Sequence, residues 1–123
     1  MSLPSPAQSL NQALTVRSSV IGRRTKLAVF GELDMATAPE LRSAVDAALS
    51  AGARDVWIDL SATEFMDSAG LHVLLETRAR LAAMRGRFAL ICADGAVRHV
   101  LRVSGVDRTL PVYADRSAAH RDA

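Results

Sequence analysis

Cysteine and aromatic residues are scarce in this sequence, which has one cysteine, one tryptophan, one tyrosine and three phenylalanines among 123 residues. The one thiol, Cys92, cannot form an internal disulfide, and its place at the end of the apolar run 88–92 predicts a buried structural group. No run is long and apolar enough to predict a transmembrane helix. Residues 1–12 lack the cationic cluster and apolar stretch of a secretory signal. These absences predict a cytoplasmic protein.

An excess of one charge is also absent. The 15 Lys and Arg residues against 13 Asp and Glu residues give a formal net charge of +2, and the basic residues are scattered. A nucleic-acid surface is therefore not expected. The histidines and the cysteine lack metal-ligand spacing, and the glycines form neither a dinucleotide-binding nor a P-loop signature. We therefore expect no metal, no cofactor and no catalytic residue.

The composition is that of a soluble globular domain, because 50% of the residues are hydrophobic and 23% are charged. A chain of this length forms about one domain with one core. The prolines and serines of residues 1–12 predict a flexible N-terminal tail. One domain is expected over 13–118, followed by a C-terminal tail over 119–123.

Two β-favouring runs open the predicted domain. Residues 13–20 and 26–30 flank a Gly-Arg-Arg segment, which predicts a hairpin with a basic tip. Further strands are predicted at 55–60, 88–92 and, as a short edge strand, 110–113.

Helical periodicity separates the later strands. A helix is predicted from about residue 38 to Gly52, with Thr37 as its cap, Pro39 in its first turn and Glu40 completing a capping box. A second helix begins near Ser68, and a third ends at Gly105. The residues expected to be buried on the second helix are Leu71, Leu74, Leu75, Leu81 and Ala82. The alternation predicts an α/β fold: a mixed four- to five-stranded sheet with an opening hairpin and helices packed mainly on one face.

Ser68 lies at a predicted strand-to-helix junction, directly after Asp67. As a helix cap, its hydroxyl would lie at the surface among unpaired backbone N–H groups, and an ordinary structural cap would account for the residue. A phosphate on this oxygen would add about two negative charges at the positive end of the helix dipole, where the fold tolerates them. A partner surface built against a neutral hydroxyl would lose affinity for the modified form.

Two motifs carry a resemblance to a known family. The Gly-Glu-Leu-Asp segment at 31–34 is one, and the Phe-Met-Asp-Ser-Ala-Gly-Leu segment at 65–71, preceded by Ile-Asp-Leu-Ser at 58–61, is the other. Together they resemble the anti-sigma factor antagonists of the STAS domain family, over roughly residues 13–118. The resemblance implies a STAS-like fold and phosphorylation of Ser68.

The resemblance also implies a set of partners. The unphosphorylated form would bind an anti-sigma factor that is also an ATP-dependent serine kinase, and would thereby release a sigma factor. Phosphorylation of Ser68 would end this binding, and a metal-dependent serine phosphatase would restore it. No nucleic acid and no membrane is implied as a partner, and the oligomeric state, monomer or weak dimer, stays open.

The docking surface that the resemblance implies combines the two motif turns. Its expected members are Asp34, Met35, Ala36, Thr37, Asp67, Ser68, Ala69, Gly70 and His72. Ala69 stands where a second hydroxyl residue is common in the family, which leaves Ser68 as the acceptor. His72 occupies a position where small residues are frequent in relatives, so it would tune partner specificity; a solvated histidine is the alternative. Asp34 is also open to an interpretation as a polar turn residue.

Other functions fit parts of the pattern. A hydrolase built on Ser68, His72 and Asp67 lacks the Gly-x-Ser-x-Gly elbow. A phosphoacceptor receiver is suggested by Asp59 at a strand end, but it lacks an acidic pair for Mg²⁺, and Lys26 is misplaced for a phosphate partner. A STAS-like scaffold or an accessory subunit of a transport complex would use the same face without a phosphorylation cycle.

Overall fold

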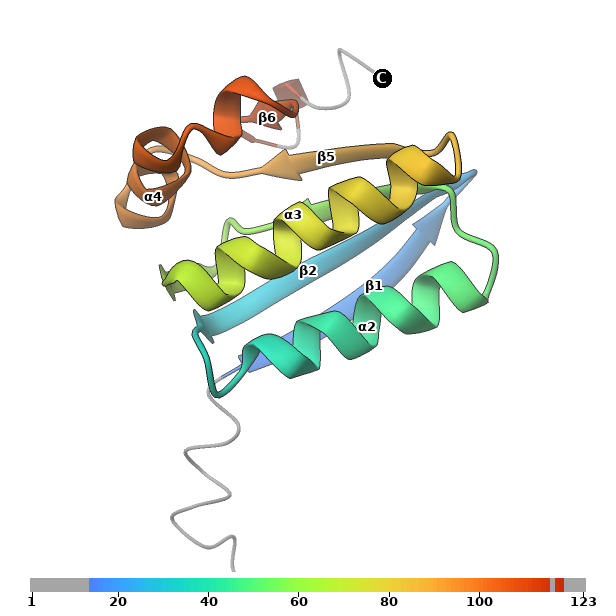
Figure 1. Ribbon diagram of the computed structural model, residues 1–123, viewed down its shortest axis with the longest axis horizontal. Helices are drawn as coiled ribbons and strands as arrows, with labels where there is room; N and C mark the ends of the chain where they lie inside the picture. Colours follow the sequence, from blue (N-terminus) through green and yellow to red (C-terminus); the bar gives the residue numbers. More distant parts are fainter. Residues whose placement is uncertain (1–13, 116, 119–123) are drawn as a thin grey trace, which may run out of the picture.

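A computed structural model describes residues 14–115, 117 and 118 of the chain. These residues form a single α/β domain in which helices cover a mixed sheet (Figure 1). The tails predicted at 1–12 and 119–123 lie outside the described residues. Within the described part, none of the helices combines the length and the apolar character needed to cross a bilayer.

A β-hairpin opens the domain, as predicted. Strand β1 (Leu14–Ile21) pairs antiparallel with β2 (Arg24–Leu33) along its whole length, from Leu14 opposite Gly31 to Ile21 opposite Arg24. Gly22 has a φ of +62° in the connecting turn, a conformation that glycine adopts without strain.

The remaining strands extend the sheet in parallel with β2. Strands β3 (Asp55–Asp59), β5 (Arg87–Ile91) and β6 (Val112–Tyr113) follow in the order β1-β2-β3-β5-β6. A sixth strand, β4 (Thr63–Met66), pairs with the end of β2. The expected sheet had four to five strands, because β4 is short and two of its four residues are exposed, so its apolar signal is weak.

The helices lie on one face of this sheet (Figure 1). Helices α2 (Ala38–Ser50) and α3 (Ser68–Ala83) run beside each other across it, and α4 (Ala96–Ser104) with the 3₁₀ helix η1 (Val106–Arg108) follows β5. The largest fully buried side chains between the layers are leucines, valines and one isoleucine, Ile58. Burying them supplies most of the stabilisation of the fold.

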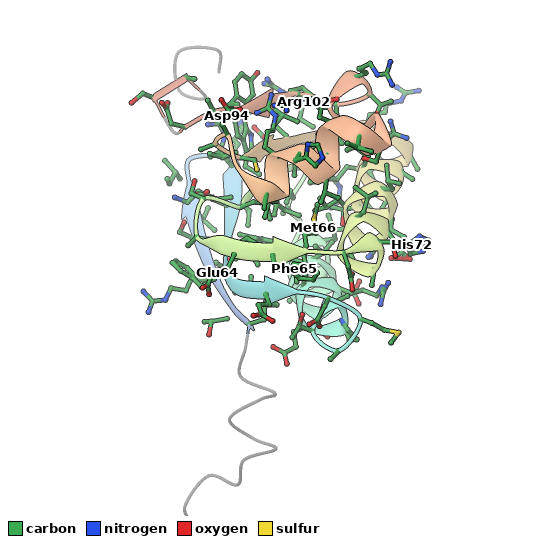
Figure 2. The ribbon with its side chains drawn as sticks, turned by 90° about the vertical axis from the view of Figure 1, so that its left-hand side faces the viewer. Glu64, Phe65, Met66, His72, Asp94 and Arg102 are labelled. Atoms are coloured by element: carbon green, nitrogen blue, oxygen red, sulfur yellow. The ribbon has the colours of Figure 1, made fainter. Side chains whose placement is uncertain are left out.

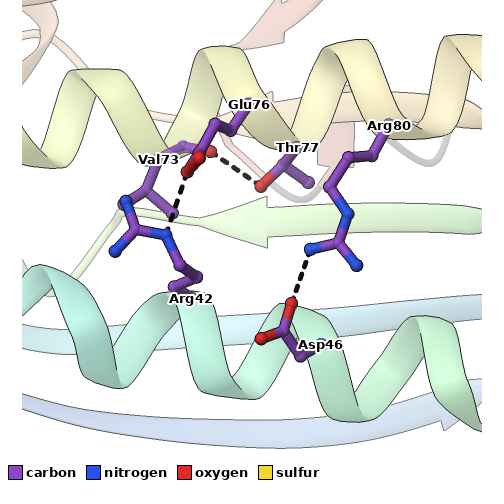
Figure 3. A network of polar contacts seen from close by, with 6 residues as sticks. All are labelled: Arg42, Asp46, Val73, Glu76, Thr77 and Arg80. Atoms are coloured by element: carbon purple, nitrogen blue, oxygen red, sulfur yellow. Dashed lines mark hydrogen bonds and ion pairs between the residues drawn. The ribbon is translucent and has the colours of Figure 1, made fainter.

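The buried face of α3 differs in part from the predicted one. Leu74 and Leu81 are buried as expected, but Ala82 is exposed, and Val73 and Thr77 are buried instead. Leu71 and Leu75 are half-buried. Threonine is polar and was not expected to be buried. Thr77 can be buried because its Oγ1 donates a hydrogen bond to the Val73 carbonyl of the same helix at 2.7 Å (Figure 3).

Charged side chains bridge α2 and α3 along their outer side (Figure 3). Arg42 Nε lies 3.0 Å from Glu76 Oε1, and Arg80 Nη1 lies 2.5 Å from Asp46 Oδ1. All four side chains are partly exposed, so each pair contributes at most about 1 kcal/mol. Apolar packing therefore holds the two helices together.

The opposite face of the sheet carries a small second apolar cluster. Trp57, Ala89 and Ile91 are buried there, with Tyr113 packed against them. The rings of Trp57 and Tyr113 stack with their centroids 5.2 Å apart, and the Arg24 guanidinium lies 4.0 Å from the centroid of the Trp57 ring. These neighbours leave the indole only 3% exposed.

Candidate functional site

Two turns lie side by side at one edge of the sheet, where β2 and β4 end. The two strands are parallel, with Leu33 opposite Met66, so the next residues, Asp34 and Asp67, begin neighbouring turns. The Asp67 backbone N–H donates to the Leu33 carbonyl at 3.1 Å and joins the turns. Parallel pairing thus brings together the two sequence motifs, although Asp34 and Asp67 are 33 positions apart in the sequence.

The first turn is closed by Asp34. Its Oδ1 accepts from the backbone N–H groups of Ala36 at 2.9 Å and of Thr37 at 3.1 Å. This Asx-type arrangement holds the turn and leaves Met35 protruding, 79% exposed. Asp34 therefore has a structural role, in agreement with the alternative interpretation of this residue.

Thr37 is at the N-cap position of α2, as predicted, but the capping box is wrong. Its side chain makes no capping hydrogen bond to α2. Instead, Oγ1 donates to the Glu32 carbonyl at 2.7 Å and accepts from the Asp34 N–H at 2.9 Å. The residue is 2% exposed, and its hydroxyl ties the start of the helix back to the end of β2.

The N-cap of α3 is Asp67, which corrects the prediction that Ser68 caps this helix. Asp67 has an extended backbone, and its Oδ1 accepts from the N–H groups of Ala69 at 2.8 Å and Gly70 at 3.4 Å. Aspartate and serine are comparable caps, and the residue that precedes the first helical turn takes the position. Ser68 is consequently the first residue of α3, exposed and released from capping.

Gly70 lies where the first turn of α3 meets the ends of β2 and β4. A Cβ atom at this position would come within 2.6 Å of Leu33 Cγ and 2.8 Å of Met66 Cγ. Only glycine permits so close an approach, and this places Ser68 beside the Asp34 turn. Gly70 is itself buried, so its contribution to any docking surface is positional.

The other predicted site residues on α3 are Ala69, which is half-buried, and His72, which is exposed. His72 follows Ser68 by four positions and extends from α3 into solvent (Figure 2). Residues four apart share one face of a helix. The structure therefore brings Ser68 and His72 onto one surface.

An exposed aromatic residue beside the site was not predicted. Phe65 on β4 (Figure 2) is 47% exposed. It lies opposite Glu32 of β2 in the strand pairing. The adjacent Met66 is buried, so the alternation of an outward Phe65 with an inward Met66 marks a strand. This alternation over two residues is the only feature of the sequence that could have predicted an exposed Phe65.

The residues behind the alternative functions are placed differently. Asp59 is 2% exposed, and its Oδ1 accepts from the Ser61 N–H at 2.9 Å, so this carboxylate is not presented to a phosphate donor. Cys92 is buried, as predicted, and burial raises the pKa of its thiol. In the described part of the chain, no three His, Cys, Asp or Glu side chains gather in a way that could hold a metal ion.

Comparison with known proteins gives consistent matches. Residues 13–119 match the family model of the STAS domain. The anti-sigma-F factor antagonist RsfB of Mycobacterium tuberculosis is 28% identical over 88 residues, which are 72% of this chain and 71% of that protein. BtrV of Bordetella bronchiseptica is 33% identical over 89 residues, 72% of this chain and 77% of that protein. The crystal structure of an anti-sigma factor antagonist from Mycobacterium paratuberculosis superimposes with a TM-score of 0.77 at 32% identity, over 90% of both chains.

Proposed function

The chain belongs to the STAS domain family, and from this we propose that it is an anti-sigma factor antagonist whose binding is switched by phosphorylation of Ser68. In its unmodified form it binds an anti-sigma factor and so frees a sigma factor. The anti-sigma factor, acting as an ATP-dependent serine kinase, modifies Ser68 and ends the complex. A metal-dependent serine phosphatase restores the binding form.

The observation that carries this proposal is the separation of two roles at the start of α3. Asp67 caps the helix, while Ser68 next to it is exposed. A hydroxyl used as a cap accepts from the backbone and is partly covered, whereas the Ser68 oxygen is open to a kinase. Modification of this oxygen would therefore leave the helix cap in place.

The electrostatics of the same position support a switch that spares the fold. The N-terminus of a helix attracts negative charge, but the Asp67 carboxylate already occupies it. A phosphate on Ser68 is attracted by the positive end of the α3 dipole and repelled by the negative Asp67 carboxylate. Solvent weakens both interactions because Ser68 is exposed. We expect the two effects nearly to cancel in the free protein.

In a complex the balance is different. A partner surface that covers Ser68 would bury the phosphate without a counter-charge, at a cost of about 3 to 4 kcal/mol, which corresponds to binding weaker by roughly several hundred-fold. The docking surface in this proposal consists of the two turns and the start of α3. Its accessible members are Asp34, Met35, Ala36, Asp67, Ser68, Ala69 and His72, with Phe65 added, and the buried Thr37 and Gly70 hold the two turns in position. Met35 and Phe65 are its exposed apolar side chains and would contribute most of the contact energy.

A mass measurement tests the modification directly. The protein is incubated with ATP and an anti-sigma kinase encoded in the same genome, and a single added phosphate is expected. Ser68→Ala should accept none, and Ser43→Ala, which removes another exposed serine, should accept one. Absence of phosphate from the unaltered protein with every such kinase would contradict the proposal.

A second measurement separates binding from stability. Ser68→Asp should unfold thermally within a few degrees of the unaltered protein, while its affinity for the anti-sigma factor falls by at least about tenfold. A constitutive scaffold that uses the same face would also lose affinity in Ser68→Asp, and it is distinguished by accepting no phosphate in the mass measurement. Unfolding of Ser68→Asp would instead disprove the electrostatic argument.

A further inference from the structure

Strand β1 forms a long open edge of the sheet. All eight of its residues pair with β2 on one side, and the order of the described strands places β1 at the end of the sheet. Edge strands are commonly protected by charges, prolines, bulges or short length. β1 has one charged residue, Arg17, and no proline, whereas β6, the strand at the other end, has only two residues. The β1 edge is therefore available for pairing.

A groove runs between this strand and α2. Its volume is about 410 Å³, and Val16, Ser18 and Val20 line it on the strand side. The helix side is lined by alanines at Ala44, Ala47, Ala48 and Ala51, which are too small to fill it. Val20 is 70% exposed at one end of the groove. The groove is thus an open apolar surface continuous with the open strand edge.

The two ends of the groove have opposite charge. Arg23, in the hairpin turn, lines the end near Gly52 and Ala53. Glu40, in the first turn of α2, lies one helical turn before Ala44 on the same stripe and is exposed. α2 begins directly after β2 ends, so Glu40 is at the level of the first residues of β1. The surface is therefore basic at one end, apolar in the middle and acidic at the other.

We propose that this surface binds a second copy of the chain, with the two β1 strands antiparallel about a twofold axis near Ser18. Such pairing places Val16 of each copy opposite Val20 of the other and joins the two sheets. It also brings Arg23 of each copy to Glu40 of the other, so the surface is complementary to itself. The alanine stripes of the two α2 helices can approach closely because they carry no bulky side chain.

The proposed dimer interface does not include Ser68. Ser68 begins α3, which lies over the middle of the sheet, whereas β1 and α2 form its side (Figure 1). The antiparallel arrangement directs the two Ser68 sites toward opposite ends of the dimer. A failure of phosphorylation would leave the dimer unaffected, and the reverse also holds.

Sedimentation equilibrium of the full chain over a wide concentration range tests the proposal. The expected result is a reversible monomer–dimer equilibrium. Ala47→Glu, which puts a charge into the groove at an exposed helical position, should abolish the dimer. Ala79→Glu, the matched change at an exposed position of α3, should leave the dimerisation constant unchanged.

A charge-reversal cycle tests the orientation. Arg23→Glu and Glu40→Arg should each raise the dimer Kd by roughly tenfold, and the double variant should recover most of the loss. Arg87→Glu, at an exposed position on β5, is the control for net charge.

Two outcomes overturn the proposal. One is a dimer that Ala47→Glu leaves intact, which would place the interface elsewhere. The other is a monomer at every concentration. If the β1 amides that point away from β2 are protected from hydrogen exchange in that monomer, residues 1–13 of the same chain, and not a second copy, cover the strand.

Discussion

Asp67 accepts hydrogen bonds from two backbone amides that lie in the first turn of α3 and have no intrahelical partner. Asp34 does the same for the turn before α2, through the amides of Ala36 and Thr37. Each aspartate directly follows a strand and serves its own turn. At the residue scale, the first role of each motif is therefore to end a strand and to start a helix.

Replacement of Asp67 tests the capping role. Asp67→Ala should lower the free energy of unfolding by about 1 kcal/mol, because two helical N–H groups lose their acceptor. Asp67→Asn keeps an acceptor and should lose less, and Ser68→Ala should stay within about 0.5 kcal/mol of the unaltered protein. Urea unfolding followed by circular dichroism measures all three. A larger effect for Ser68→Ala than for Asp67→Ala would assign the cap to the serine.

Sequence reasoning identified the junction at Asp67 and Ser68 but assigned the cap to the wrong residue. Both residue types cap helices well, so the choice depends on which one has an extended backbone, and that is fixed by the pairing of β4 with β2. Thr37 shows the same limit, because its hydroxyl is engaged by Glu32, a residue of β2 that the local pattern does not connect to it. The local sequence pattern thus predicted where the two helices begin. Which side chain bonds to which backbone group was decided by contacts between the strands and the turns.

At the scale of elements, the start of α3 is packed against the ends of β2 and β4. The contact depends on Gly70, since any side chain there meets Leu33 and Met66, both of which are almost fully buried. The hydrophobic periodicity predicted the long α2 and α3 well. It failed at β4, where four residues with a mixed pattern become a strand only because β2 extends far enough to pair with them.

Gly70→Ala tests this packing. Alanine favours a helix over glycine by about 1 kcal/mol, yet the Cβ would lie 2.6 Å from Leu33 Cγ. We expect the steric overlap of this Cβ with Leu33 to outweigh the gain in helix propensity. The free energy of unfolding should fall by about 1 to 3 kcal/mol. Urea unfolding provides the measurement, with Gly70→Ser as a second variant that should be at least as destabilised. A gain in stability would show that α3 can move away from the strands.

At the scale of the whole molecule, one sheet separates two apolar regions of unequal size. The large core lies under the helices, and the small cluster around Trp57 lies on the opposite face. β3 and β5 contribute to both regions, because alternate residues of a strand point to opposite faces. The continuous apolar runs in the sequence predicted that both faces of these strands are covered. The partners of Trp57 were not predictable, because Tyr113 and Arg24 are far from it in the sequence.

Trp57 provides a test of cooperativity, because it is the one tryptophan of the chain. Its burial predicts emission at short wavelength in the native state, and Arg24→Ala should shift that emission to longer wavelength by admitting water. In urea, the emission and the helical circular dichroism should change with the same midpoint, since the two regions share their strands. Separate midpoints would show that the Trp57 cluster unfolds independently of the helices.

The two aspartate turns also bear on how fast a partner can be captured. The Asp34 turn is closed by its own side-chain hydrogen bonds, and the Asp67 N–H ties the second turn to the end of β2. The surface around Ser68 is therefore ordered before any encounter, and association needs no rearrangement of these loops. Among variants of this surface, the association rate constant should vary little. Differences in affinity should arise mainly from differences in the dissociation rate constant.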